Sequence, residues 1–189
     1  MVGMSLFDST TKGRLLLATP PLEDPNFDRT VIYMLEHTTD GAVGVVLNRP
    51  GSETSVDGLD DWVEQLSPPY VLFSGGPVEV DALIALGRAD GPNADAWSPI
   101  VGDLGTLDLN LDPEHVAQRV RQLRIFRGYA GWGELQLDSE LAAGAWMVLP
   151  ADVDDMFTPR PEDLWRDVLR RQGGRLAWIA NAPDDLSAN

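Results

Sequence analysis

Two β-branched runs separated by a short turn constrain this chain more than any other feature. TVIYMLEH (30–37) and AVGVVLN (42–48) flank TTDG, whose Asp-Gly pair is typical of a hairpin loop. Both faces of the first run are largely apolar, which indicates a strand that is covered on both sides. The two runs therefore predict an antiparallel hairpin at the centre of a sheet.

The remaining pattern mixes strands and helices without a regular βαβ repeat, which favours an α+β fold over a doubly wound parallel sheet. Further strands are predicted at residues 12–20, 70–76, 81–88, 124–131 and 145–150, with 70–76 pairing with 81–88. Helices are predicted at 57–66, 113–123, 134–143 and 161–172, and a loop at 90–103. The chain of 189 residues is long enough to bury a core of its own, so we expect a single domain over 1–189.

The charge is strongly negative and unevenly distributed. The net charge is −16, and residues 1–118 hold 19 acids against 5 bases, whereas residues 119–189 hold 11 against 9. The absence of cysteine excludes disulfides and thiolate chemistry. No apolar run approaches the ~20 residues of a membrane span, and the start MVGMSLFDSTTKG lacks the pattern of a secretory signal. We expect a cytoplasmic protein that has no membrane partner.

Ordinary catalytic and cofactor motifs are missing from the sequence. It contains no GxSxG, no HExxH and neither standard phosphate loop, and its two histidines are His37 and His115. Glu36 and His37 are neighbours in a predicted strand, so they point to opposite faces and cannot share a metal ion. We expect capped or surface histidines, with no metal, no cofactor and no catalytic residue that can be named.

A glycine-rich corner, IFRGYAGWGELQLDSE (125–140), is the main candidate site. Free N–H groups at the start of the helix, with Arg127 nearby, would suit a carboxylate or a phosphate. Against this, Glu134 is expected in the first helical turn, where its charge answers the dipole. The glycines also permit close packing around Tyr129 and Trp132. Packing is the favoured interpretation and binding is the second.

Two other segments carry candidate ligand contacts. LNRP (47–50) places Asn48 and Arg49 at a strand end, and SGGP (74–77) could form a backbone concavity for an anion. The alternatives are a salt bridge from Arg49 to one of the acids, and a tight turn between strands. We predict that one concavity is lined by the following residues: Arg49, Ser74, Gly75, Gly76, Arg127, Tyr129 and Trp132.

Four sequence blocks resemble the signature blocks of the AlgH/YqgE family of bacterial proteins. These blocks are GRLLLATPPLEDPNFDRTVIYMLEH, GAVGVVLNRP, SGGPV and RGYAGWGELQLDSE, which lie within residues 13–152. The resemblance implies an α+β fold with a small barrel-like, branched β-sheet core flanked by helices. The family carries a historical label as a regulator of alginate synthesis, and it has no agreed catalytic residues, so the resemblance brings none to this chain.

Three functional hypotheses remain. The favoured one is a non-catalytic binding or regulatory module that acts through a protein partner or a small anionic ligand. The second is an enzyme with an atypical acid/base site near Arg127 and Glu134. The third is a transcriptional regulator, for which direct DNA binding is disfavoured, because no single face is expected to gather the arginines and the acids of residues 1–118 repel phosphate.

Overall fold

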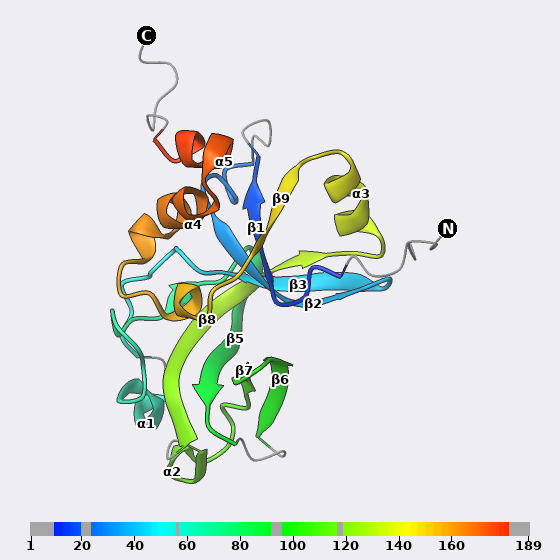
Figure 1. The fold of residues 1–189 in the computed structure, drawn as a ribbon. Coiled ribbons are helices and arrows are strands. Elements are labelled where there is room, and N and C mark those ends of the chain that lie inside the picture. Colours follow the sequence, from blue (N-terminus) through cyan, green and yellow to red (C-terminus); the bar gives the residue numbers. More distant parts are fainter. Residues whose placement is uncertain (1–9, 20–23, 56, 92–95, 117–118, 182–189) are drawn as a thin grey trace.

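A strongly curved, largely antiparallel sheet is the framework of the molecule (Figure 1). The computed structural model describes residues 10–19, 24–55, 57–91, 96–116 and 119–181. The strand order is β6-β7-β5-β8-β3-β2-β1-β9, and β4 pairs with β8 outside this order as a branch. The fold is α+β with a barrel-like, branched sheet, as predicted.

The elements have the following bounds. The strands are β1 (Arg14–Ala18), β2 (Val31–Thr38), β3 (Gly41–Val46), β4 (Phe73–Ser74), β5 (Val78–Ala89), β6 (Trp97–Val101), β7 (Leu104–Leu107), β8 (Val120–Trp132) and β9 (Trp146–Pro150). The α-helices are α1 (Asp60–Val63), α2 (Pro113–Val116), α3 (Gln136–Ala142), α4 (Leu164–Gln172) and α5 (Gly174–Ile179). Two 3-10 helices are η2 (Val153–Phe157) and η3 (Pro161–Asp163).

The central hairpin is confirmed. Strands β2 and β3 are antiparallel, with Tyr33 opposite Val45. The two faces of β2 enter different cores: Val31 and Tyr33 pack in a cluster that includes α4, whereas Ile32 and Met34 pack in a cluster that includes Leu137 of α3. Coverage on both sides explains why this strand is apolar on both faces.

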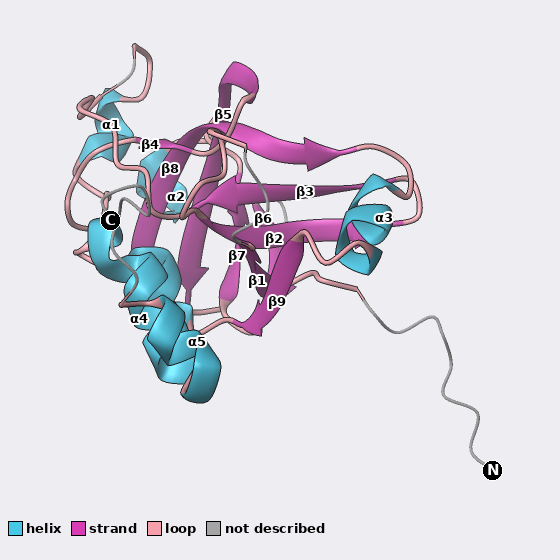
Figure 2. Cartoon of the chain, turned by 90° about the horizontal axis from the view of Figure 1, so that it is seen from above, coloured by secondary structure: helices cyan, strands magenta, loops and turns pink. Residues whose placement is uncertain are grey.

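Strand β8 connects the two halves of the sheet. Its first part pairs antiparallel with β5, and its last residues pair antiparallel with β3. At Phe126 and Arg127, which also pair with β5, it pairs in parallel with β4, and Phe73 lies opposite Phe126. The helices cover different ends of the curved sheet: α4 and α5 lie together on one side, and α3 lies at the far end of β2 and β3 (Figure 2).

The predicted helix at 113–123 is wrong beyond its first turn. Helix α2 ends at Val116, residues 117–118 lie outside the described residues, and β8 begins at Val120. Leu123 and Ile125 pack in one core cluster while Phe126 packs in another. Burial on alternating faces is the period of a strand, and it overrides the helical spacing that Val116, Val120 and Leu123 share by chance.

Several smaller predictions also need correction. The strand predicted at 70–76 is only β4, and it pairs with β8 rather than with residues 81–88. The predicted loop at 90–103 contains β6, which pairs with β7, while its residues 92–95 lie outside the described part. The helix predicted at 57–66 is the short α1, whereas the helices predicted at 134–143 and 161–172 are found as α3 and as η3 with α4. Within the described residues, no helix is long and apolar enough to cross a membrane.

Candidate functional site

The glycine-rich corner is first of all a crossing of two backbones. The Gly75 N–H donates to the Arg127 carbonyl over 2.7 Å. A Cβ on Gly75 would lie 2.3 Å from the Gly128 carbonyl oxygen, and a Cβ on Gly76 would lie 2.2 Å from the carbonyl carbon of Tyr129. Real Cβ atoms do not approach backbone so closely, so Gly75 and Gly76 are required where the two backbones cross. In the corner itself, a Cβ on Gly128 would lie 2.6 Å from the Gly76 carbonyl oxygen, which agrees with the close-packing interpretation.

The end of the corner belongs to a separate aromatic core. Trp132 stacks on Phe27 and meets Trp146 edge to face. The indole N–H groups of Trp132 and Trp146 both donate to Glu140 Oε2, over 3.0 and 2.7 Å. Trp132 therefore anchors α3 to the sheet and lies in a different cluster from the core beneath α4.

The start of α3 offers little to an anion. Glu134 is exposed in the turn before the helix, not in its first turn as predicted, and Leu135 at the N-cap has a φ of 52°. The Gly133 N–H already donates to Gln136 Oε1 over 3.0 Å. A helix terminus that its own side chain caps is a poor anion site.

Asn48 and Arg49 hold neighbouring segments of the backbone together. Asn48 Oδ1 accepts from the Val31 N–H and its Nδ2 donates to the Arg29 carbonyl, both over 2.8 Å. The Arg49 carbonyl accepts from the Ser74 N–H, while its Nη2 donates to the Pro25 carbonyl. Asn48 thus fixes the start of β2, and the Arg49 guanidinium is engaged by backbone rather than by an acid.

A cavity of about 290 Å³ gathers three of the predicted site residues: Ser74, Gly76 and Arg127. We call it the Arg127 pocket; its other lining residues are Gly51, Ser52, Glu53, Leu72, Phe73 and Val80. Arg127 Nε lies 2.9 Å from Glu53 Oε2. Arg49, Gly75, Tyr129 and Trp132 are not among the residues that line this pocket, so the seven predicted residues do not share one concavity.

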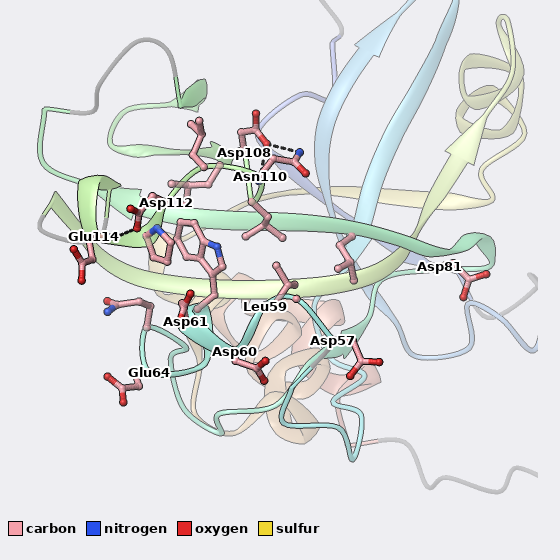
Figure 3. A pocket seen from close by; sticks show the side chains of 18 residues that line it. Asp57, Leu59, Asp60, Asp61, Glu64, Asp81, Asp108, Asn110, Asp112 and Glu114 are labelled. Carbon is pink, nitrogen blue, oxygen red and sulfur yellow. Dashed lines mark hydrogen bonds between the residues drawn. The ribbon is translucent and has the colours of Figure 1, made fainter.

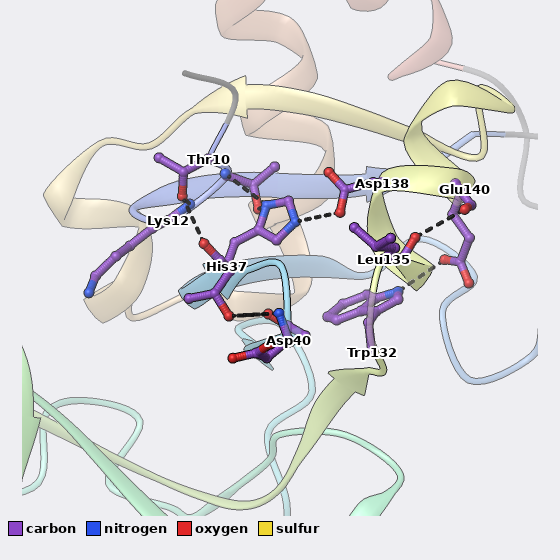
Figure 4. A network of polar contacts seen from close by, with 12 residues as sticks. Thr10, Lys12, His37, Asp40, Trp132, Leu135, Asp138 and Glu140 are labelled. Carbon is purple, nitrogen blue, oxygen red and sulfur yellow. Dashed lines mark hydrogen bonds and ion pairs between the residues drawn. The ribbon is translucent and has the colours of Figure 1, made fainter. Parts of the chain in front are cut away.

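His37 is a buried clamp rather than a solvated side chain (Figure 4). Its Nδ1 accepts from the Thr11 N–H over 3.2 Å and lies 3.0 Å from Thr11 Oγ1, while its Nε2 lies 3.4 Å from Asp138 Oδ2. The side chain is 5% exposed, so of the two predicted environments, capped or surface, the surface one does not apply to His37. The Thr–His–Asp order resembles a catalytic triad, but Thr11 is 2% exposed and its hydroxyl is out of reach of a substrate. The array instead ties residues 10–11 to β2 and α3.

One hollow on the described surface of the molecule is acidic, and the sequence interpretation missed it (Figure 3). Its volume is about 1340 Å³, and it lies between α1, β5 and the segment from β7 to α2. We call it the acidic hollow; its eight carboxylates are Asp57, Asp60, Asp61, Glu64, Asp81, Asp108, Asp112 and Glu114.

The described lining of the acidic hollow carries these eight carboxylates and no Lys, Arg or His. Leu59, Trp62, Leu83, Leu107 and Leu109 supply its apolar part. Hydrogen bonds from the Asn110 backbone and side chain hold the pKa of Asp108 below its usual range. In the described part of the chain no three His, Cys, Asp or Glu side chains are arranged to hold a metal ion.

Comparison with known proteins settles the family. A family model described as AlgH-like matches residues 15–177. The chain belongs to the AlgH-like family. It is 48% identical to a UPF0301 protein of Streptomyces coelicolor over the full length of both chains, and 47% identical to one of Thermobifida fusca over 94% of each.

Solved structures of similar proteins share the architecture. A crystal structure of a protein from Corynebacterium diphtheriae superposes with a TM-score of 0.84 at 30% identity, covering 90% of this chain and 92% of that one. The solution structure of AlgH from Pseudomonas aeruginosa superposes with a TM-score of 0.71 at 29% identity, covering 98% of this chain and 100% of that one. The α+β fold expected from the resemblance is confirmed.

This AlgH-like chain also has an unusual buried cation, Arg124, whose burial the sequence interpretation did not predict. Its side chain is 1% exposed and lies 4.2 Å above the Phe73 ring. It donates to the carbonyls of Pro68, Met156 and Thr158 over 2.5, 3.0 and 2.9 Å. Burial lowers the pKa of Arg124 to about 10, so the group stays charged at neutral pH. In the sequence, the burial of Arg124 could have been inferred from its apolar neighbours Leu123, Ile125 and Phe126.

Proposed function

We propose that this AlgH-like protein is a non-catalytic binding module whose acidic hollow takes a lysine- or arginine-rich segment of a partner protein. The observation that carries the proposal is the set of eight carboxylates around one hollow with no basic residue among its described lining. Elsewhere in the described part of the chain, acids such as Asp103 and Asp155 are paired with arginines. The hollow therefore concentrates negative charge on one part of the described surface.

The shape of the acidic hollow fits long basic side chains. Lysine and arginine bury their methylene stems against apolar surface while the charged head stays among polar groups. Leu109 and Leu83 are half-buried in the hollow, and the acids stand around them. The negative field of the whole chain, with a net charge of −16, adds electrostatic steering of a basic segment toward it.

A basic peptide provides the test. We expect a fluorescein-labelled decapeptide of alternating lysine and alanine to bind saturably, and more weakly as NaCl is raised from 50 to 300 mM. The triple variant Asp60→Asn, Asp61→Asn, Glu64→Gln should bind about tenfold more weakly, the sum expected of three exposed charge contacts. Fluorescence anisotropy measures both effects.

The control separates a local site from general acidity. Asp28, Asp40 and Glu162 are exposed acids that do not line the acidic hollow. The triple variant Asp28→Asn, Asp40→Asn, Glu162→Gln changes the net charge by the same amount and should leave peptide affinity nearly unchanged. Equal losses in the two triple variants would mean that the peptide responds only to net charge, and the proposed site would be abandoned.

Duplex DNA is expected not to bind specifically. The arginines at 119, 121, 124 and 127 do not form one basic face, because Arg124 is buried and Arg121 is paired with Asp90 and Asp103. A labelled duplex titrated at low and moderate salt, with scrambled competitor, should show no sequence-dependent binding. Saturable, sequence-dependent binding tighter than about 1 µM at moderate salt, beyond the ~10⁻⁴–10⁻⁶ M of non-specific complexes, would contradict this expectation.

A further inference from the structure

The Arg127 pocket carries a guanidinium that its surroundings do not satisfy. Arg127 Nε is buried and 2.9 Å from Glu53 Oε2, but the N–H is not aligned for a hydrogen bond. No hydrogen bond joins the Arg127 side chain to any residue that the structure describes. An arginine held by a strand at the wall of a cavity, with a buried Nε–H that makes no hydrogen bond, can donate to a planar anion.

The other walls of the Arg127 pocket define the size and polarity of what fits. Its volume of about 290 Å³ is at the lower end of the ~300–1,000 Å³ that is usual for small-molecule sites. Leu72, Phe73 and Val80 line it with apolar surface, and the exposed Ser74 adds a hydroxyl. These walls suit a few carbon atoms attached to one charged group.

The charge of the Arg127 pocket selects among anions. Arg127 is the one basic residue among the described lining, and the neighbouring Arg49 donates instead to the Pro25 carbonyl. A single guanidinium matches one carboxylate in a bidentate way. A phosphate with two negative charges would be repelled more strongly than a monocarboxylate. The repulsion would come from Glu53 and from the field of a chain with a net charge of −16.

We propose that the Arg127 pocket binds a small monocarboxylate with a short apolar chain, and that Glu53 occupies the place of the ligand carboxylate when the pocket is empty. Glu53 comes from an exposed segment, and its side chain is 56% exposed. The Glu53 backbone stays fixed when the side chain leaves, because its carbonyl accepts from the Leu72 N–H over 2.8 Å. When a ligand carboxylate replaces the Glu53 carboxylate, the protein therefore loses only the partly exposed ion pair between Arg127 and Glu53. This site is separate from the acidic hollow and does not depend on it.

Pentanoate is the probe, and pentanamide is its neutral counterpart. Titrated into ¹⁵N-labelled protein, pentanoate should shift the backbone amide resonances of Ser74 and Gly76 saturably, and pentanamide should not. Glu53→Gln removes the internal competitor and should tighten pentanoate binding about threefold, a factor that loss of an exposed ion pair allows. Arg127→Gln should abolish the shifts, whereas Arg160→Gln, which removes a mostly exposed arginine outside the pocket, should not.

The tighter pentanoate binding expected for Glu53→Gln tests the proposal even if Arg127→Gln folds poorly. Absence of saturable shifts in Glu53→Gln, or equal shifts with pentanamide, would overturn the proposal. Tighter binding of inorganic phosphate than of pentanoate would overturn the assignment to monocarboxylates. None of these results bears on the lysine-containing peptide, so failure here and failure of the acidic hollow are distinguishable.

Discussion

Replacement of Arg124 by methionine should destabilise the protein by about 3–5 kcal/mol, the range seen when one partner of a buried charged contact is removed. Methionine fills much of the volume, but it leaves the carbonyls of Pro68, Met156 and Thr158 without their donor. Those carbonyls come from segments that precede and follow β8 in the chain. The guanidinium therefore joins the turn at Pro68 to η2 and to Thr158 after it. Urea unfolding followed by tryptophan fluorescence measures the loss.

Two comparisons identify the cause of that loss. Arg124→Lys keeps the charge, but a single ammonium cannot reach all three carbonyls, so it should recover only part of the stability. Arg175→Met removes an exposed arginine and should change the free energy of unfolding by less than about 0.5 kcal/mol. A loss below about 1 kcal/mol in Arg124→Met would show that the buried guanidinium contributes little.

Arg124 also shows why part of the fold could be predicted from the sequence and part could not. The hairpin of β2 and β3 follows from local signals, namely two β-branched runs and an Asp-Gly turn. In β8 the signal is weaker, because the strand is covered on both faces and loses its alternation. In the sequence, an arginine inside such a strand resembles a residue on the polar face of a helix. Only the structure shows that its acceptors are backbone carbonyls of residues 68, 156 and 158.

The candidate sites differ in the same way. Acidity of residues 1–118 is visible in the sequence, but the acidic hollow forms only where the fold brings segment 57–64 beside segment 108–114. Arg127 was singled out because it lies beside the glycine-rich corner, yet its contact with Glu53 joins positions far apart in the chain. Glu134 was misplaced because a left-handed residue, Leu135, delays the start of α3. Long-range pairing and backbone handedness leave little trace in a single sequence.

Replacement of Gly76 by alanine should cost about 3 kcal/mol or more and prevent folding in a marginally stable background. Its φ of 151° is unfavourable for an L-residue, and the new Cβ would lie 2.2 Å from the Tyr129 carbonyl carbon, which belongs to the central strand β8 and cannot move away cheaply. Gly75→Ala should behave similarly, since its Cβ would lie 2.3 Å from the Gly128 carbonyl oxygen.

Gly102→Ala is the matched control for these two changes. Like Gly76, and unlike Gly75, it has a positive φ, here 59°, but a Cβ there has nothing within 4 Å, so only the backbone cost of about 1 kcal/mol applies. Chemical denaturation of the three variants compares steric contact with backbone handedness. If Gly75→Ala and Gly76→Ala cost no more than Gly102→Ala, the crossing of the two glycine segments would tolerate side chains. The glycines at 75 and 76 would then have to be explained by something other than packing. A cost well above the control would show that close backbone contact fixes β4 against β8, and with it the wall of the Arg127 pocket.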